Sequence, residues 1–164
     1  MNLDQFEIDR SYDRCSHLLK RIDLGASEGY MDFRENNQKL ANQPLRRMSN
    51  LTRAMLSGID FDEIKQKRLS NFAQLHIALK DSNKFEIPEI SSFECPMVYP
   101  YLTHDHTLKQ RLIENKVFVA TYWPNVREWV KEGVLEYELT ELLLPIPCDQ
   151  RYDLSDLSKI ITLQ

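Results

Sequence analysis

The sequence predicts an α+β fold in which N-terminal helices precede a small, mainly antiparallel sheet with helices packed on one face. Three observations support this prediction. Apolar residues recur at helical spacing through the first half of the chain. Two short apolar runs, 117–120 and 142–146, are too short for helices and favour strands. In the second half, prolines separate short strand-like runs from helix-like segments, which is typical of an α+β domain.

The bulk composition narrows the class of protein. The chain has 164 residues, with 42% apolar and 28% charged side chains, which indicates a globular domain rather than a disordered chain. A net charge of −4 without any Lys or Arg block argues against a nucleic-acid partner. No apolar stretch approaches the roughly 20 residues that span a bilayer, and the first residues lack the apolar core of a signal peptide. Three widely spaced cysteines suit reduced thiols, so we expect a cytoplasmic protein.

The first predicted helix depends on five apolar residues spaced four, three, four and three apart, which places them on one face. They are Ile8, Tyr12, Cys15, Leu19 and Ile22. We expect this helix to end near Gly25. A second helix is predicted after a Ser27 cap, with an inner face formed by Tyr30, Phe33 and Leu40.

Two further helices have clear start signals. Ser49 is a predicted N-cap of a short helix that ends at Gly58, in the place of a left-handed residue. Asp60 and Glu63 resemble a capping box, and this helix is expected to run to about Lys80. Its expected inward residues are Ile64, Phe72, Leu75 and Leu79. Arg68 falls on the same stripe, where an arginine usually lays its stem on the core and keeps its charge in water.

The second half is predicted to hold four strands and several short helices. We expect an edge strand at 85–87, a strand at 97–102 interrupted by Pro100, a strand at 117–121, and a strand at 142–146. Asp105 or Thr103 can cap a helix between the second and third strands. One or two helical turns are expected around 126–130, another at 137–143, and a last helix capped by Asp153 and Asp156.

Metal and nucleophile sites have little support in the sequence. His104 and His106 could offer two imidazoles to a metal, but a zinc site needs three or four ligands at defined spacing. Polar turn residues and helix caps are the simpler explanation. A cysteine–histidine pair using Cys15, Cys95 or Cys148 is equally unsupported, because buried cysteine usually acts as a small apolar residue.

The strongest candidate site combines aromatic residues with an arginine. Tyr122-Trp123-Pro124 follows one predicted strand, and Pro124 is expected to hold Trp123 extended. Arg151 and Tyr152 follow another. Tyr122, Trp123, Arg151 and Tyr152 could together line a ligand cleft, with the guanidinium as a fork for carboxylate or phosphate. The alternative is that the aromatic rings cover the sheet edge and that Arg151 pairs with Asp149 or Asp153.

Several stretches of the chain resemble the small domain of pyridoxal-phosphate-dependent sugar aminotransferases of fold type I, the DegT/StrS-like family. The stretches are MSNLTRAMLSGIDFDEIKQKRLSNFAQLHIAL, with Arg68, Asn71 and Leu75 in an R-x-x-N-[YF]-x-x-L spacing, then CPMVYP, VFVATYWPNV and LLLPIPCDQRY. The run from Ser11 to Leu45 resembles the helical segment that precedes that domain. Where the family usually has a Tyr-Pro pair leading to a His, this chain has Trp-Pro and Asp-Gln-Arg-Tyr.

The resemblance implies a helical segment at 1–46 and an aminotransferase-like small domain at 47–164. It also implies amino-group transfer to a keto-sugar nucleotide by the complete enzyme, with pyridoxal phosphate as cofactor. Nothing in the chain resembles the family's lysine-bearing, cofactor-binding large domain, so we expect no cofactor on this chain and no activity from it alone. We expect a segment from a truncated or split gene, forming a homodimer or joining a separate large domain. The alternative is a stand-alone binding or oligomerisation domain with the same fold.

Overall fold

The computed structural model describes residues 3–25, 27–89, 91 and 94–164, and it confirms the α+β class. The chain divides into an N-terminal unit, Met1–Ile59, and a C-terminal unit, Asp60–Gln164. The boundary expected between 46 and 47 concerns the limits of a family domain and stays a prediction. Within the described residues, no helix is long and apolar enough to cross a membrane.

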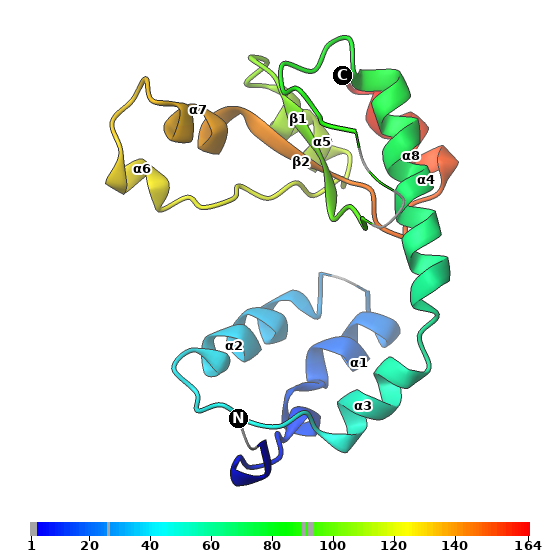
Figure 1. Cartoon of the computed structure of the whole chain (residues 1–164), viewed down its shortest axis with the longest axis vertical. Coiled ribbons are helices and arrows are strands. Elements are labelled where there is room, and N and C mark those ends of the chain that lie inside the picture. Colours follow the sequence, from blue (N-terminus) through cyan, green and yellow to red (C-terminus); the bar gives the residue numbers. More distant parts are fainter. Residues whose placement is uncertain (1–2, 26, 90, 92–93) are drawn as a thin grey trace. The chain divides into compact units, whose positions relative to one another are not determined.

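The N-terminal unit is built from short helices (Figure 1). They are the 3-10 helices η1 (Leu3–Gln5) and η2 (Ser11–Arg14) and the α-helices α1 (Ser16–Asp23), α2 (Tyr30–Leu40) and α3 (Asn50–Ser57). An isolated parallel bridge pairs Ile8 with Arg47, so the segment before η2 lies beside the segment before α3. Ser49 caps α3 as predicted, because its hydroxyl accepts a hydrogen bond from the Thr52 N–H.

Other expectations for this unit were wrong. The expected first helix is not continuous. It divides at Cys15 into the 3-10 helix η2 and the α-helix α1, which have different hydrogen-bonding patterns. Ser27 does not cap α2, which begins after Gly29 without a side-chain cap. Gly58 has a φ of −90°, so it ends α3 without the left-handed conformation. Gly25 does adopt a positive φ, +99°, just after α1.

The C-terminal unit contains the long helix, the sheet and four short helices. The elements are α4 (Phe61–Leu79), β1 (Val98–Leu102), α5 (Leu108–Glu114), α6 (Val126–Trp129), α7 (Leu135–Leu142), β2 (Leu143–Pro147) and α8 (Leu154–Thr162). Asp60 caps α4 by accepting from the Glu63 N–H. Asp153 and Asp156 form a complete capping box at the start of α8.

The strands β1 and β2 form a two-stranded antiparallel sheet whose register tolerates three prolines. Pro100 lies opposite Pro145, and Val98 lies opposite Pro147. These pairs alternate with pairs that contain no proline. In an antiparallel ladder only every second pair exchanges N–H···O hydrogen bonds, so the pairs without proline supply all the N–H donors that the ladder needs. The side chain of Asn83 bonds the other edge of β1: Nδ2 donates to the Pro100 carbonyl, and Oδ1 accepts from the Leu102 N–H.

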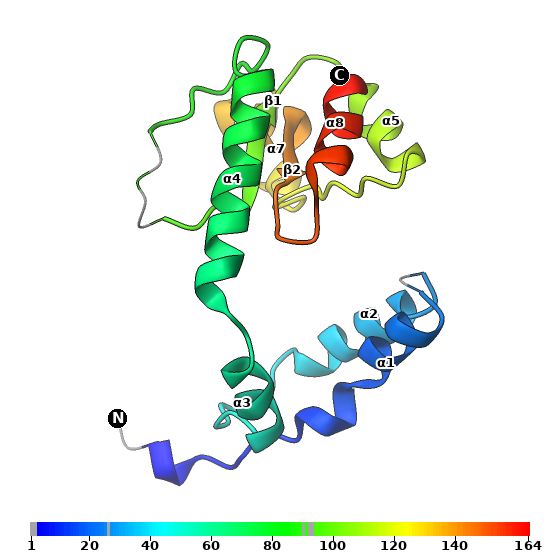
Figure 2. The ribbon, with the colours of Figure 1, turned by 90° about the vertical axis from the view of Figure 1, so that its right-hand side faces the viewer.

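The core of this unit lies between α4, the sheet and α8. Figures 1 and 2 both show α8 alongside α4, with the strands beside them, and α4 contacts both β1 and α8. Tyr99 of β1 is fully buried, and its ring lies 5.1 Å from that of Phe72 on α4. Leu75 and Leu79 of α4 are buried as predicted, whereas Leu154 of α8 is 63% exposed.

Two predicted strands are absent from the residues that the structure describes. Residues 85–87 and 117–121 are irregular. Val117 and Val119 are buried while Phe118 between them is 72% exposed, so the alternation of a strand is present. A strand also needs a hydrogen-bonding neighbour, and in the part of the chain that the structure describes, β1 and β2 pair with each other and not with this segment.

Candidate functional site

The residues of the R-x-x-N spacing hold the loop that follows β2. Asn71 on α4 is 1% exposed, and its Nδ2 lies 3.0 Å from the Asp149 and Tyr152 carbonyls and 3.3 Å from the Cys148 carbonyl. Two amide hydrogens therefore serve three backbone acceptors. One turn earlier on α4, Arg68 is half-buried and donates to Gln150 Oε1 at 3.1 Å. The loop is thus fixed to α4 by side-chain hydrogen bonds.

Arg151 pairs with Asp149, which was the alternative that the sequence left open. Nε lies 2.8 Å from Oδ1 and Nη2 lies 2.9 Å from Oδ2, so the pair is bidentate. This hydrogen bonding holds the pKa of the Asp149 carboxyl below its usual range, although burial of the carboxyl opposes the shift. Because the Asp149 carboxylate occupies one hydrogen-bonding side of the Arg151 guanidinium, the charge of Arg151 is already balanced within the loop.

The four predicted site residues belong to two segments: Tyr122 and Trp123 precede α6, and Arg151 and Tyr152 lie between β2 and α8. Tyr122 and Trp123 contact each other, with ring centroids 5.5 Å apart. Among the described residues, no hydrogen bond, ion pair or ring contact links them to Arg151 or Tyr152. Trp123 has a φ of +49°, so the expected extended conformation was wrong. It is 69% exposed and lies in a left-handed conformation that is unusual for a bulky residue.

The candidate metal ligands and nucleophiles do not assemble into a metal site among the described residues. His104 and His106 are exposed, and the described residues contain no group of three side chains that could hold a metal ion. Cys148 is fully buried, and burial raises the pKa of its thiol to about 11, which disfavours the reactive thiolate. Cys95 is exposed.

The lysines of the described residues do not fit the link that pyridoxal phosphate makes to a protein. That cofactor needs a lysine in a pocket to form its link to the protein. The lysines of this chain are all exposed or half-buried. Of the two cavities described for the N-terminal unit, the one between α1, α2 and α3 has no lysine in its lining, and the other includes Lys39. The lining of that open cavity also includes Asp9 and Arg46, so its charge is mixed. We therefore assign no chemical step on this chain to the cofactor.

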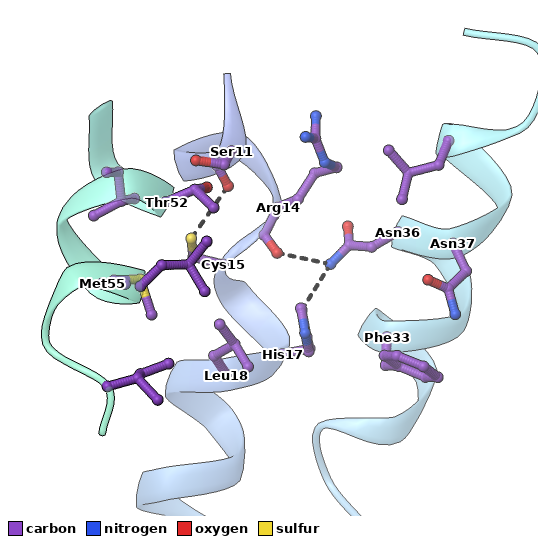
Figure 3. Close-up of a pocket in the computed structure, with 14 residues that line it drawn as sticks. Ser11, Arg14, Cys15, His17, Leu18, Phe33, Asn36, Asn37, Thr52 and Met55 are labelled. Atoms are coloured by element: carbon purple, nitrogen blue, oxygen red, sulfur yellow. Dashed lines mark hydrogen bonds between the residues drawn. The ribbon is translucent and has the colours of Figure 1, made fainter. Parts of the chain in front are cut away.

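A cavity of about 330 Å³ lies between α1, α2 and α3 in the N-terminal unit (Figure 3). Its lining is mainly apolar and comes from all three helices. The principal apolar residues are Cys15, Leu18, Phe33, Leu40, Met55 and Leu56. All of these residues except Cys15 are between 36% and 53% exposed, because the cavity opens to solvent. Cys15 is half-buried, and its thiol donates to the Ser11 carbonyl at 3.1 Å.

One buried amide organises the polar side of this cavity. Asn36 of α2 is 7% exposed, and its Nδ2 donates to the Arg14 carbonyl at 3.2 Å and to His17 Nδ1 at 3.0 Å (Figure 3). The Arg14 carbonyl can only accept, so the amide nitrogen must face it. His17 Nδ1 then also faces a donor, so it acts as the acceptor of this hydrogen bond, which favours the tautomer with the ring proton on Nε2. The His17 ring packs 5.7 Å from the Phe33 ring.

A close backbone approach brings α1 and α2 together beside this cavity. Gly29, the residue before α2, is buried, and a Cβ placed on it would lie 2.7 Å from the His17 carbonyl oxygen. Sequence reasoning missed the cavity. The available signal was the pair of apolar stripes predicted for the first two helices, since these stripes supply Cys15, Phe33 and Leu40.

Comparison with protein-family models, with curated proteins and with solved structures finds no match to this chain.

Proposed function

We propose that this chain is the small-domain part of a sugar aminotransferase and that it supplies no catalytic lysine itself. The observation that carries the proposal is the use of the motif residues on α4. Arg68 and Asn71 both bond the loop at the end of β2, and Leu75, one turn later, is fully buried in the same core. The residues behind the sequence resemblance thus have linked structural roles, which supports a shared fold. The proposed activity rests on the resemblance.

The requirements of the cofactor determine which part of the enzyme this chain can supply. Amino-group transfer through pyridoxal phosphate requires a lysine, an acid at the pyridine nitrogen and a phosphate site. The residues of this chain do not fit these roles. The catalytic lobe must therefore come from another polypeptide or another segment, and we propose that this chain completes it. The substrate would be a keto-sugar nucleotide, with an amino acid as the donor.

Reconstitution tests this proposal. The full chain is mixed with a fold-type-I sugar aminotransferase lobe that keeps its lysine but has its own small domain deleted. We expect a complex with one copy of each by light scattering, and amino transfer from glutamate to a keto-sugar nucleotide only in the mixture. Asn71→Leu, which frees the loop after β2, should weaken the activity of the mixture. Activity of the chain alone, or no complex with any such lobe, would contradict the proposal.

A stand-alone binding domain is the second candidate, and the open apolar cavity between α1, α2 and α3 favours it. Apolar side chains of the N-terminal unit also remain exposed, including Ile22 at 80% and Leu45 at 70%. Such surface tends to promote association, so a homodimer is part of this proposal. Sedimentation velocity over a hundredfold range of concentration tests it, because a purely monomeric chain would remove the homodimer.

A further inference from the structure

We propose that the cavity between α1, α2 and α3 binds a small, neutral, mostly apolar molecule that carries one hydrogen-bond donor, such as a hydroxyl group. This inference concerns the N-terminal unit alone and does not depend on the aminotransferase proposal. It assigns a ligand class to a site whose lining includes none of the predicted site residues Tyr122, Trp123, Arg151 and Tyr152.

The size and lining of the cavity define the body of the ligand. A volume of about 330 Å³ is at the lower end of the range of about 300–1,000 Å³ that is typical of ligand pockets. Phe33, Leu40 and Met55 line it from two different helices, and each is about half exposed. An apolar body that fills the cavity would remove these side chains from water, which is the main favourable term in binding of this kind.

The charge of the lining excludes an ionic ligand. Arg14 is the charged residue that lines this cavity, and its guanidinium is paired with Asp9. A charged ligand would lose its hydration and gain no free counter-charge. A neutral ligand avoids this cost.

The donor requirement comes from Asn36. Both amide hydrogens are used, by the Arg14 carbonyl and by His17 Nδ1, but Oδ1 accepts no hydrogen bond from the residues that the structure describes. The residue is nevertheless 7% exposed and lines the cavity. No fully buried side-chain oxygen among the described residues lacks a partner, so Oδ1 keeps some exposure, and Asn36 is part of the cavity lining. A ligand hydroxyl or amide N–H would satisfy it, and a purely apolar ligand would leave it without a partner.

Two isomers of the same formula test this requirement on the full-length chain. Benzyl alcohol has a hydroxyl donor, whereas anisole has the same atoms and no donor. Titrations of each are followed by the amide chemical shifts of the ¹⁵N-labelled chain. We expect saturable shifts confined to α1, α2 and α3. The ratio of the two affinities should move against the alcohol by about two- to tenfold in Asn36→Leu, which is the range for one lost hydrogen bond.

Two further variants keep the test decisive. Met55→Trp places a large ring in the cavity and should weaken both probes at least tenfold. Ile22→Ala, on an exposed position outside the lining, should leave both affinities unchanged. If Asn36→Leu loses its helical circular dichroism, the comparison of Met55→Trp with Ile22→Ala decides whether the cavity is the binding site. The hydrogen-bond acceptor is then tested in the wild-type chain. Benzamide, which has an N–H donor, should compete with benzyl alcohol for the site.

Three outcomes would overturn the proposal. The first is the absence of saturable shifts with either probe. The second is an affinity ratio that does not change in Asn36→Leu. The third is binding that weakens as the protein concentration rises, because a second copy of the chain would then occupy the cavity.

Discussion

The two units of this chain differ in which side chains they bury. The C-terminal unit buries fourteen apolar side chains in one core around α4, β1, β2 and α8. In the N-terminal unit, the buried residues among those described are Gly29, Asn36 and Ser49, and no apolar side chain joins them. This unit is instead connected by hydrogen bonds and by ion pairs such as Lys20–Asp32.

The difference shows that apolar content does not by itself make a core. Leu19 and Ile22 lie on the predicted apolar stripe of the first helix, yet they are 61% and 80% exposed. Helices of eight to eleven residues are marginal when isolated and depend on packing. We therefore expect the N-terminal unit to open locally at a lower free energy than the C-terminal unit.

Truncation of one leucine in each unit should give the largest difference. Leu75→Ala empties a fully buried position in α4 and should lower the free energy of unfolding by about 3 kcal/mol. Leu19→Ala, on exposed α1, should change it by no more than about 0.5 kcal/mol. Urea unfolding followed by circular dichroism measures both. A similar loss at the two positions would mean that Leu19 is covered in solution, which would break the comparison.

The two buried asparagines give the next largest difference. Asn71→Leu leaves three backbone carbonyls near the end of β2 without their donor and should cost about 2 kcal/mol. Asn36→Leu frees two acceptors beside a solvent-accessible cavity, where water can replace the amide, and should cost about 1 kcal/mol. Hydrogen exchange of α4 and α2 amides reports each effect in its own unit. A greater loss of protection from Asn36→Leu would show that the N-terminal unit depends on its polar network more than we infer.

Three of the predicted helix caps were confirmed, whereas the cap predicted at Ser27 was not. Ser49, Asp60 and Asp153 were expected to cap helices, and all three accept the hydrogen bonds that define a cap. A cap involves residues two or three positions apart, so the sequence contains the whole interaction. The strand at 143–147 was found for a similar reason, since its apolar run is continuous and ends at Pro147.

Features that need a distant partner were predicted poorly. The run at 117–121 has strand composition and alternating burial, but the sheet that the described residues form consists of β1 and β2 and does not include it. Tyr122 and Arg151 were grouped because both were expected at strand ends, and the loss of one strand removes that reason. The cavity depends on how closely α1 and α2 approach, which Gly29 permits and which no local pattern encodes.

Substitution of glycine tests this close approach within the N-terminal unit. Gly29→Ala would place a Cβ 2.7 Å from the His17 carbonyl oxygen, so α1 and α2 must separate. We expect a loss of about 1–2 kcal/mol, as in other overpacked sites. In Gly58→Ala, the nearest atom is 3.6 Å away and φ is already negative, so this control should be neutral or slightly stabilising. Hydrogen exchange of α1 and α2 amides measures the change. A neutral Gly29→Ala would mean that these helices are free to move apart.

The smallest expected effect compares one ion pair from each unit across pH and salt. The pKa of Asp149 is lowered by hydrogen bonds from Arg151, and the pKa of Asp32 is lowered by the hydrogen bond from Lys20. A lowered pKa in the folded state contributes stability above the unfolded pKa of about 4, and this contribution is lost as the pH falls through the folded value. Arg151→Gln should therefore destabilise the chain at pH 7, by at most about 1 kcal/mol because the guanidinium is largely exposed, and the difference from wild type should vanish in acid.

Salt separates the two pairs. Asp149 is 9% exposed, so its interaction with Arg151 is partly shielded from solvent ions, whereas Lys20 lies on the surface of α1. In 1 M sodium chloride, the effect of Lys20→Gln on urea unfolding should disappear, while a measurable part of the Arg151→Gln effect should remain. If salt removes both effects equally, the loop after β2 is open to solvent, and the hydrogen bonds from Asn71 do not hold it in the conformation described above.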